Sequence, residues 1–92
     1  MIVRIMTEDQ YRLADGAVTR LNELDNEAVA AVEAGDEARF ADLFGQMLDY
    51  VRAEGTVLGE DELEESDVMI PPPDLTFAEA QGEFTGEGLI PD

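Results

Sequence analysis

The sequence predicts an α+β fold: a small two- or three-stranded sheet packed with an antiparallel helical hairpin and a short C-terminal helix. Three observations support it. Apolar and polar residues alternate near the N-terminus, apolar residues then recur every three or four positions along two long segments, and a proline triplet ends a third short apolar run. A chain of 92 residues is too short for two independent cores, so we expect a single domain over residues 1–92.

The first strands are indicated by period-two alternation. Residues 2–6 place Val3 and Ile5 on one face, and residues 10–13 alternate again with Tyr11 and Leu13 together. The polar residues 7–9 between them suit a turn. These segments therefore predict a β-hairpin.

The first helix is expected to begin at Asp15, which precedes Gly16 and is a suitable N-cap. Asp25 interrupts its apolar stripe at one margin. The stripe has helical spacing and comprises Val18, Leu21, Leu24, Ala28, Val29 and Val32.

Residues 34–36 (Ala-Gly-Asp) supply a helix stop and a new N-cap, and Gly55 ends the second helix. Each helix spans about 17–19 residues, roughly 25–29 Å. Helices joined by so short a turn lie antiparallel. The apolar face of the second helix comprises Phe40, Leu43, Phe44, Met47, Leu48 and Val51.

The C-terminal third begins with an acidic loop at residues 60–67. Residues 68–70 are expected to pair with an N-terminal strand before the proline triplet stops it. Thr76 and Glu79 fit a capping box for a short helix at residues 77–84. The tail, residues 88–92, is expected to dock on the sheet or on a partner.

Charge is the strongest compositional signal. Asp and Glu total 23 against five Arg and no Lys, which gives a net charge of −18. Self-repulsion of that size becomes tolerable in molar salt, where the Debye length shrinks to about 3 Å. We interpret the composition as halophilic, with a merely acidic mesophilic protein as the alternative.

Missing residue types argue against catalysis. The chain has no Cys, His or Lys, so thiolate sites and the side chains that titrate most readily near neutral pH are excluded. We therefore predict a non-enzymatic binding protein without a cofactor. The acidic loop 60–67 lacks the spacing of a calcium loop and is better explained as solvated, although cation binding there stays open.

The same charge constrains partners and location. Nucleic acid and anionic membranes would be repelled, and no apolar run approaches the ~18 residues of a membrane span. The N-terminus is also too quickly acidic for a signal peptide, so we expect a cytoplasmic protein. A DNA mimic that regulates a nucleic-acid-binding protein is the alternative function.

Candidate partner-binding residues lie at two places. The first is the corner formed by Ile70, Pro71, Pro72 and Pro73, where a rigid proline run loses little entropy on binding; its other interpretation is a plain strand stop. The second is the apolar tail. Leu89 and Ile90 were expected to form an exposed patch with Tyr50 and Phe84, and a homo-oligomer stays open.

The whole chain resembles the PspA-associated proteins called PspAA. The resemblance is carried by residues 1–6 (MIVRIM), 10–13 (QYRL), 21–26 (LNELDN), 31–40 (AVEAGDEARF), 66–74 (SDVMIPPPD) and 87–91 (EGLIP). It implies a role in the phage-shock, or envelope-stress, response, in which PspA is a long coiled-coil protein that remodels membranes. It also implies PspA as partner, sometimes with PspAB or an HtpX-type membrane protease. We expect the helix pair or the proline corner to dock against a PspA helix.

Overall fold

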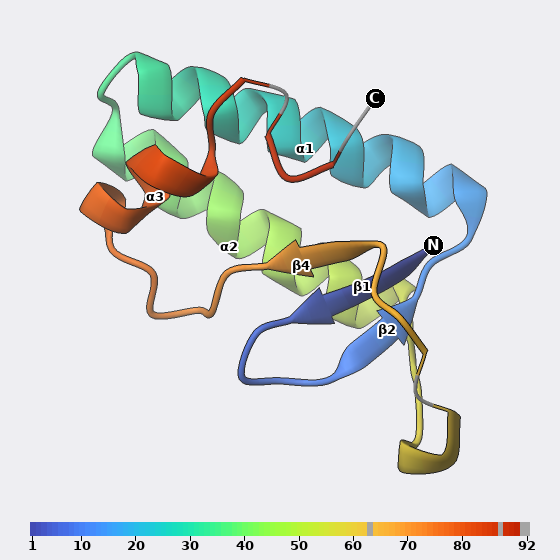
Figure 1. The fold of residues 1–92 in the computed structure, drawn as a ribbon. Helices are drawn as coiled ribbons and strands as arrows, with labels where there is room; N and C mark the ends of the chain where they lie inside the picture. Colours follow the sequence, from blue (N-terminus) through green and yellow to red (C-terminus); the bar gives the residue numbers. More distant parts are fainter. Residues whose placement is uncertain (63, 87, 91–92) are drawn as a thin grey trace.

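The sheet has four strands in the order β3–β2–β1–β4, and α2 passes behind it beside α1 (Figure 1). This computed structural model describes residues 1–62, 64–86 and 88–90. Strands β1 (Ile2–Ile5) and β2 (Gln10–Arg12) form the predicted antiparallel hairpin. Strand β4 (Val68–Ile70) pairs with β1 in parallel, as the third predicted strand. The α+β prediction is confirmed. Leu63, Glu87, Pro91 and Asp92, which complete the expected acidic loop and tail, lie outside the described residues.

A fourth strand extends the sheet beyond the prediction. Strand β3 (Thr56–Val57) pairs antiparallel with β2, placing Val57 opposite Tyr11. Two residues are too few to show alternation, which is why the sequence pattern did not reveal it. The two edge strands of the sheet are therefore β3 and β4.

Helices α1 (Asp15–Glu33) and α2 (Glu37–Glu54) form the predicted hairpin. Gly35 takes a left-handed φ of +70°, and the Asp36 side chain accepts a hydrogen bond from the Arg39 N–H at 3.1 Å, as a helix cap does. The predicted cap at Asp15 is wrong. The carbonyl of Ala14 already accepts hydrogen bonds from the next turn, so Ala14 is the N-cap and Asp15 is the first helical residue.

The core lies between the helix pair and one face of the sheet. Val3 and Ile5 of β1 are fully buried, as their alternation predicted, and they join the apolar stripes of both helices. Val18 is only half-buried at the start of its stripe. Asp25 is the exception among these apolar neighbours, because its side chain is also fully buried.

The opposite face of the sheet carries Gln10, which is buried although polar. Its amide nitrogen donates to the Glu64 carbonyl at 2.6 Å and to the Ser66 hydroxyl at 2.8 Å. These bonds fix the end of the acidic loop to the sheet just before β4. The loop itself contains a short 3-10 helix, η1 (Glu60–Glu62).

Helix α3 (Phe77–Glu83) lies beside the first half of α2, near the turn that joins α1 to α2 (Figure 1). The predicted capping box is present: the Thr76 hydroxyl accepts from the Glu79 N–H at 3.2 Å, and the Glu79 carboxylate accepts from the Thr76 N–H at 3.0 Å. Phe84 is the C-cap of the helix. The capping box thereby fixes where the chain turns after the prolines.

Candidate partner-binding surface

The proline corner connects the buried edge of the sheet to the exposed start of α3. Ile70 and Pro71 are buried, Pro72 is half-buried and Pro73 is exposed. The Leu75 N–H donates to the Pro72 carbonyl at 3.0 Å and closes a turn. The corner thus serves both as a strand stop and as a short exposed segment, and its buried and exposed ends have different roles.

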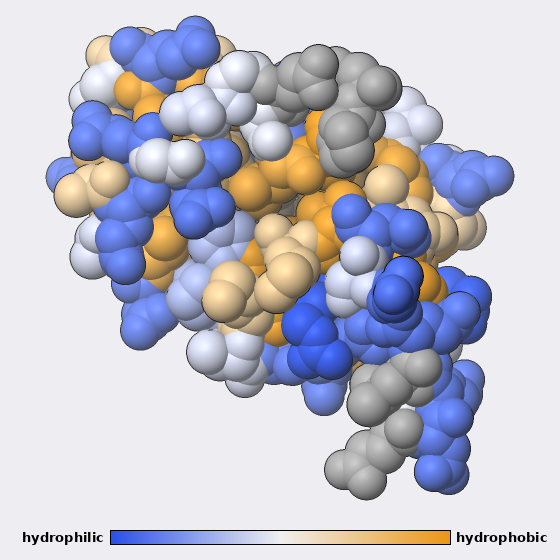
Figure 2. Space-filling model, in the orientation of Figure 1, coloured by the Kyte–Doolittle hydropathy of each residue, from blue (hydrophilic) through white to orange (hydrophobic). Residues whose placement is uncertain are grey.

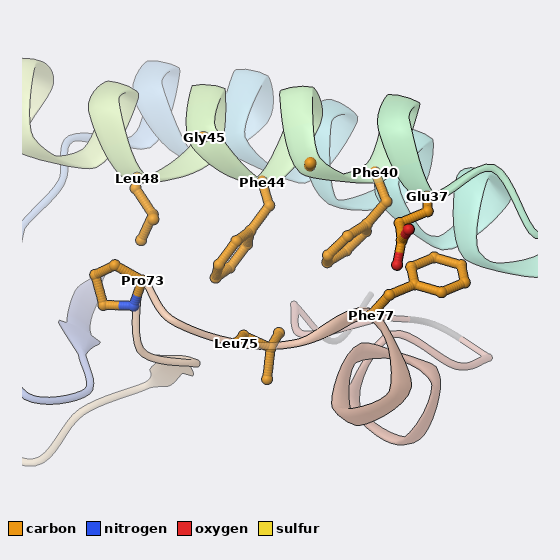
Figure 3. Close-up of a pocket in the computed structure, with 9 residues that line it drawn as sticks. Glu37, Phe40, Phe44, Gly45, Leu48, Pro73, Leu75 and Phe77 are labelled. Carbon is orange, nitrogen blue, oxygen red and sulfur yellow. The ribbon is translucent and has the colours of Figure 1, made fainter.

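One apolar groove, here called the α2 groove, separates this segment from helix α2. It has a volume of about 360 Å³. In Figure 3 the side chains of Phe40, Phe44 and Leu48 extend from α2 toward the opposite wall. That wall and the rest of the lining comprise Pro73, Leu75, Phe77, Glu37, Ala41 and Gly45.

A second apolar groove, here called the methionine groove, lies on the sheet side of the same segment and has a volume of about 450 Å³. Its most exposed large apolar members are Met69 on β4, at 53%, and Met6 just after β1, at 41%. The rest of its lining comprises Pro71, Pro72, Leu75, Glu79 and Glu83. Methionine side chains are flexible and adapt to differently shaped partners.

Leu75 lines both grooves, so the two form one continuous surface, here called the ridge surface. Hydrophobic atoms also reach the surface between hydrophilic side chains in the middle of the face shown in Figure 2. Contiguous exposed apolar surface of this kind marks interaction sites more often than scattered apolar residues do. The ridge surface is therefore the best candidate binding site of the described chain.

Packed aromatic rings support the floor of the α2 groove. Phe40 and Phe44 are stacked with their ring centres 5.6 Å apart. Phe84, fully buried, meets Phe40 edge-on at 5.0 Å and Phe44 at 6.0 Å, and Phe77 approaches Phe40 at 6.0 Å. Such edge-on and offset contacts hold rings in defined orientations. The shape of the groove consequently depends on where α3 sits.

Acidic side chains border the ridge surface. Of the described residues that line the two grooves, Glu37, Glu79 and Glu83 are charged and none is an arginine. Hydrogen bonds from the Thr76 N–H and hydroxyl lower the pKa of Glu79, so this carboxylate stays ionised well below neutral pH. A partner placed here meets apolar surface with a negative rim.

The arginines of the chain lie outside the ridge surface, and most of them form ion pairs with carboxylates. Arg52 bonds to Glu8, which raises the pKa of its guanidinium, and it also approaches Asp49. Surface pairs of this kind contribute little to stability, but they neutralise the few cations that the chain has. Among the described residues the other ion pairs are Arg12–Glu64, Arg20–Glu23 and Arg39–Glu27, while Arg4 donates to the Glu8 backbone carbonyl.

The expected exposed patch of Tyr50, Phe84, Leu89 and Ile90 is not assembled. Phe84 and Ile90 are buried in the core, and Leu89 is half-buried. The reason is that the tail folds back onto α1, where Asp25 accepts hydrogen bonds from the N–H groups of Leu89 and Ile90. Tyr50 lines a separate shallow hollow of about 330 Å³ between the two long helices.

Several residues of the ridge surface were missed by the sequence interpretation: Met6, Met69 and Phe77. Met69 follows the alternation of its strand, with buried neighbours on either side, so the period-two pattern contained a signal for its exposure. The grooves themselves are formed by residues more than 20 positions apart, and no local pattern predicts them.

The described residues offer no arrangement typical of a metal centre. Across residues 1–62, 64–86 and 88–90, no three or more Asp and Glu side chains converge in a way that could hold an ion. In the same part of the chain, no helix combines the length and apolar character that crossing a membrane requires.

Comparison with known protein families gives one match. The model of the PspAA family, described as PspA-associated protein, matches residues 1–92. The chain belongs to the PspA-associated protein family. The resemblance seen in the sequence is thereby confirmed over its whole length. Neither the comparison with curated proteins nor that with solved structures gives a match. The family description associates PspAA proteins with PspA and names no chemical reaction.

Proposed function

We propose that this PspAA-family chain is a non-enzymatic accessory protein that binds PspA through the ridge surface and thereby modulates PspA assembly or membrane engagement. The observation that carries the proposal is the pair of apolar grooves that meet at Leu75. The association expressed in the family description supports the choice of partner. The cytoplasm as location, and PspAB or an HtpX-type protease as further partners, belong to the same proposal.

The shape of the α2 groove suits an amphipathic helix. An apolar floor between two walls is the usual receptor for the apolar side chains of such a helix. Ala41 and Gly45 on α2 are small, so a partner helix can approach the α2 backbone closely between the rings. The helices of a coiled-coil protein such as PspA carry apolar stripes of the required kind.

Charge favours a partner with basic residues beside its apolar stripe. The glutamates at the rim attract Lys or Arg, and such pairs set orientation and specificity more than affinity. A second copy of this chain brings a net charge of −18, and four of its five arginines are already paired with carboxylates. Self-association on this face is therefore electrostatically opposed, and we favour a different protein as occupant.

A substitution at Gly45 tests the α2 groove. A β-carbon at Gly45 would meet no atom within 4 Å, and replacing a helical glycine stabilises the helix. Gly45→Leu is therefore expected to keep the fold while filling the groove. Its affinity for PspA, measured by calorimetry in molar KCl, should fall about tenfold or more, since overpacking a contact costs about 1–3 kcal/mol.

Gly16→Leu is the control, because Gly16 is also helical and without neighbours within 4 Å, but it lies in the first turn of α1 and is exposed where Gly45 is half-buried. It should bind PspA like the unmodified protein. Equal PspA affinity for both glycine variants would contradict docking in the α2 groove.

The two edge strands of the sheet provide a second matched pair. Met69 on β4 and Val57 on β3 are 53% and 52% exposed, so Glu at either position adds the same charge to a similar surface. Met69→Glu should weaken PspA binding, and Val57→Glu should not. If capture from lysate instead recovers DNA-binding proteins that DNA displaces, the DNA-mimic alternative is the better account.

A further inference from the structure

Asp25 is a buried carboxylate that the proposed docking does not contact directly. It lies on α1 with no exposed surface. Its Oδ2 accepts hydrogen bonds from the N–H groups of Leu89 and Ile90, each at 2.9 Å, and its Oδ1 lies 3.1 Å from the Leu89 nitrogen. The Asp25 carboxyl thereby supplies an acceptor to both N–H groups, and a backbone N–H that is buried without an acceptor is costly. The carboxylate thus ties the tail to a helix 64 residues earlier in the chain.

Gly88 lets the tail backbone close around this carboxylate. It takes a left-handed φ of +82°, and a β-carbon there would lie 2.6 Å from the Asp25 Oδ2. No larger residue fits without displacing the carboxylate or the tail. Asp25, Gly88, Leu89 and Ile90 together form a fastening, here called the tail clasp.

The tail clasp is connected to the α2 groove through α3. The tail follows Phe84, which caps the C-terminal end of α3 and packs edge-on against Phe40 and Phe44. The first residue of α3, Phe77, is part of the groove lining. A helix of seven residues has little stability of its own, so its position depends on what holds its two ends. The capping box acts at one end and the tail clasp just beyond the other.

We propose that Asp25 is a positioning residue: by clasping the tail it fixes α3, and through Phe84 and Phe77 it sets the width of the α2 groove. The inference rests on the proposed function for its effect on PspA binding. Its structural part, the control of Phe77 and Phe84 by Asp25, stands independently of PspA. Loss of the tail clasp lets α3 shift, and the groove then loses its fitted wall.

Asp25→Asn separates the acceptor role of Asp25 from its volume. Asparagine has the same shape, but its NH₂ group cannot accept the hydrogen bonds that the Leu89 and Ile90 N–H groups donate to the Asp25 carboxyl. The exchange of the Leu89 and Ile90 amide protons should speed up about tenfold to a hundredfold, as expected when a buried hydrogen-bond acceptor is lost. Glu33 on the same helix is exposed, and Glu33→Gln makes the same carboxylate-to-amide change, so it should leave the exchange of the Leu89 and Ile90 amide protons unchanged.

Fluorine-labelled phenylalanine reports on the groove directly, because the chain has four phenylalanines and all belong to the aromatic cluster. In Asp25→Asn the ¹⁹F signals of Phe77 and Phe84 should shift or broaden, whereas Glu33→Gln should match the unmodified protein. The affinity of Asp25→Asn for PspA should fall about tenfold.

A double-mutant cycle with Gly88 tests the contact itself. Gly88→Ala should release the tail through its clash with the carboxylate. In the double variant Asp25→Ala, Gly88→Ala that clash is absent, so the two effects on amide exchange should be far from additive. Additive effects would overturn the assignment of Gly88 to the tail clasp.

The outcomes separate the two proposals. If the unmodified chain fails to bind PspA, the proposed function fails, and the tail clasp is judged on the amide exchange and the ¹⁹F signals alone. If Asp25→Asn leaves the Phe77 and Phe84 signals in place, the positioning role is overturned whatever PspA does. If those signals move but PspA affinity is unchanged, the link from the tail clasp to docking is overturned.

Discussion

The first 54 residues and the segment from β4 to the tail are stabilised in different ways. The N-terminal region buries long apolar stripes from two helices against β1 and β2, each element continuing directly into the next. The C-terminal region has shorter elements that contribute fewer residues each to the core: β4, which pairs with β1 over three residues, and α3, which lies between the capping box at Thr76 and the tail clasp at Asp25.

The difference explains where the candidate site lies. The α2 groove is the seam between the two regions, with one wall from each. The second wall is carried by short elements, and its Phe77 and Phe84 rings pack against Phe40 of α2. Such a wall can change position without unfolding the long helices behind it. Variants in the two regions should therefore have effects of different kind and size.

The largest effect is expected from the core of the N-terminal region. Met47 on α2 is fully buried, and Met47→Ala should lower the free energy of unfolding by about 2–5 kcal/mol because it leaves a cavity. Urea unfolding followed by circular dichroism in molar KCl measures this cost. Both regions should unfold together.

Val57→Ala on the exposed edge strand is the control, with an expected change within about 0.5 kcal/mol. If Met47→Ala unfolded only the C-terminal region and left the N-terminal region folded, Met47 would not be part of a core that the two regions share.

An intermediate and local effect is expected at the capping box. Thr76→Ala removes the hydroxyl that accepts from the Glu79 N–H, at a cost of about 0.5–2 kcal/mol. The loss should appear as faster amide exchange within α3 and leave α1 and α2 protected. Equal acceleration across all three helices would show that the two regions are not separable.

The smallest effect is expected from pH. The pKa of Glu79 lies below its ordinary value because Thr76 donates hydrogen bonds to the carboxylate. Its contribution to folding is therefore complete above the ordinary carboxyl pKa and is lost as pH falls through the lowered value. NMR titration of the Glu79 side chain should show this lowered pKa, and in Thr76→Ala the pKa should rise only in part, because the backbone N–H at position 76, the larger cause, is retained. An ordinary carboxyl pKa for Glu79 in the unmodified protein would show that the hydrogen bonds from Thr76 do not stabilise the ionised carboxylate.

Local patterns predicted the elements of both regions. Alternation located the hairpin, the three- and four-residue spacing located both helices, and Thr76 with Glu79 located the start of α3. These signals come from neighbouring residues whose geometry is fixed by a single element. The cap at Asp15 failed because strand β2 and helix α1 follow so closely that Ala14 already accepts the first helical bonds.

Contacts between residues far apart in the chain could not be predicted from sequence patterns. Asp25 was seen only as a break in an apolar stripe, because its partners lie 64 and 65 positions later. The exposed patch expected from Phe84 and Ile90 is not formed for the same reason: Phe84 packs against Phe40 and Phe44 of α2, and Ile90 is buried beside Asp25 of α1. The strand stop at the proline corner could be predicted from the sequence, but the groove wall that faces it on α2 depends on tertiary packing.

Hydrogen exchange of the full chain with and without full-length PspA, in molar KCl, tests the central claim most directly. The ridge surface predicts protection at residues 69–79 and at residues 40–48 of α2, while β3 and the first turns of α1 exchange as before. Protection confined to β3 or to α1, or none at saturating PspA, would contradict docking on the ridge surface.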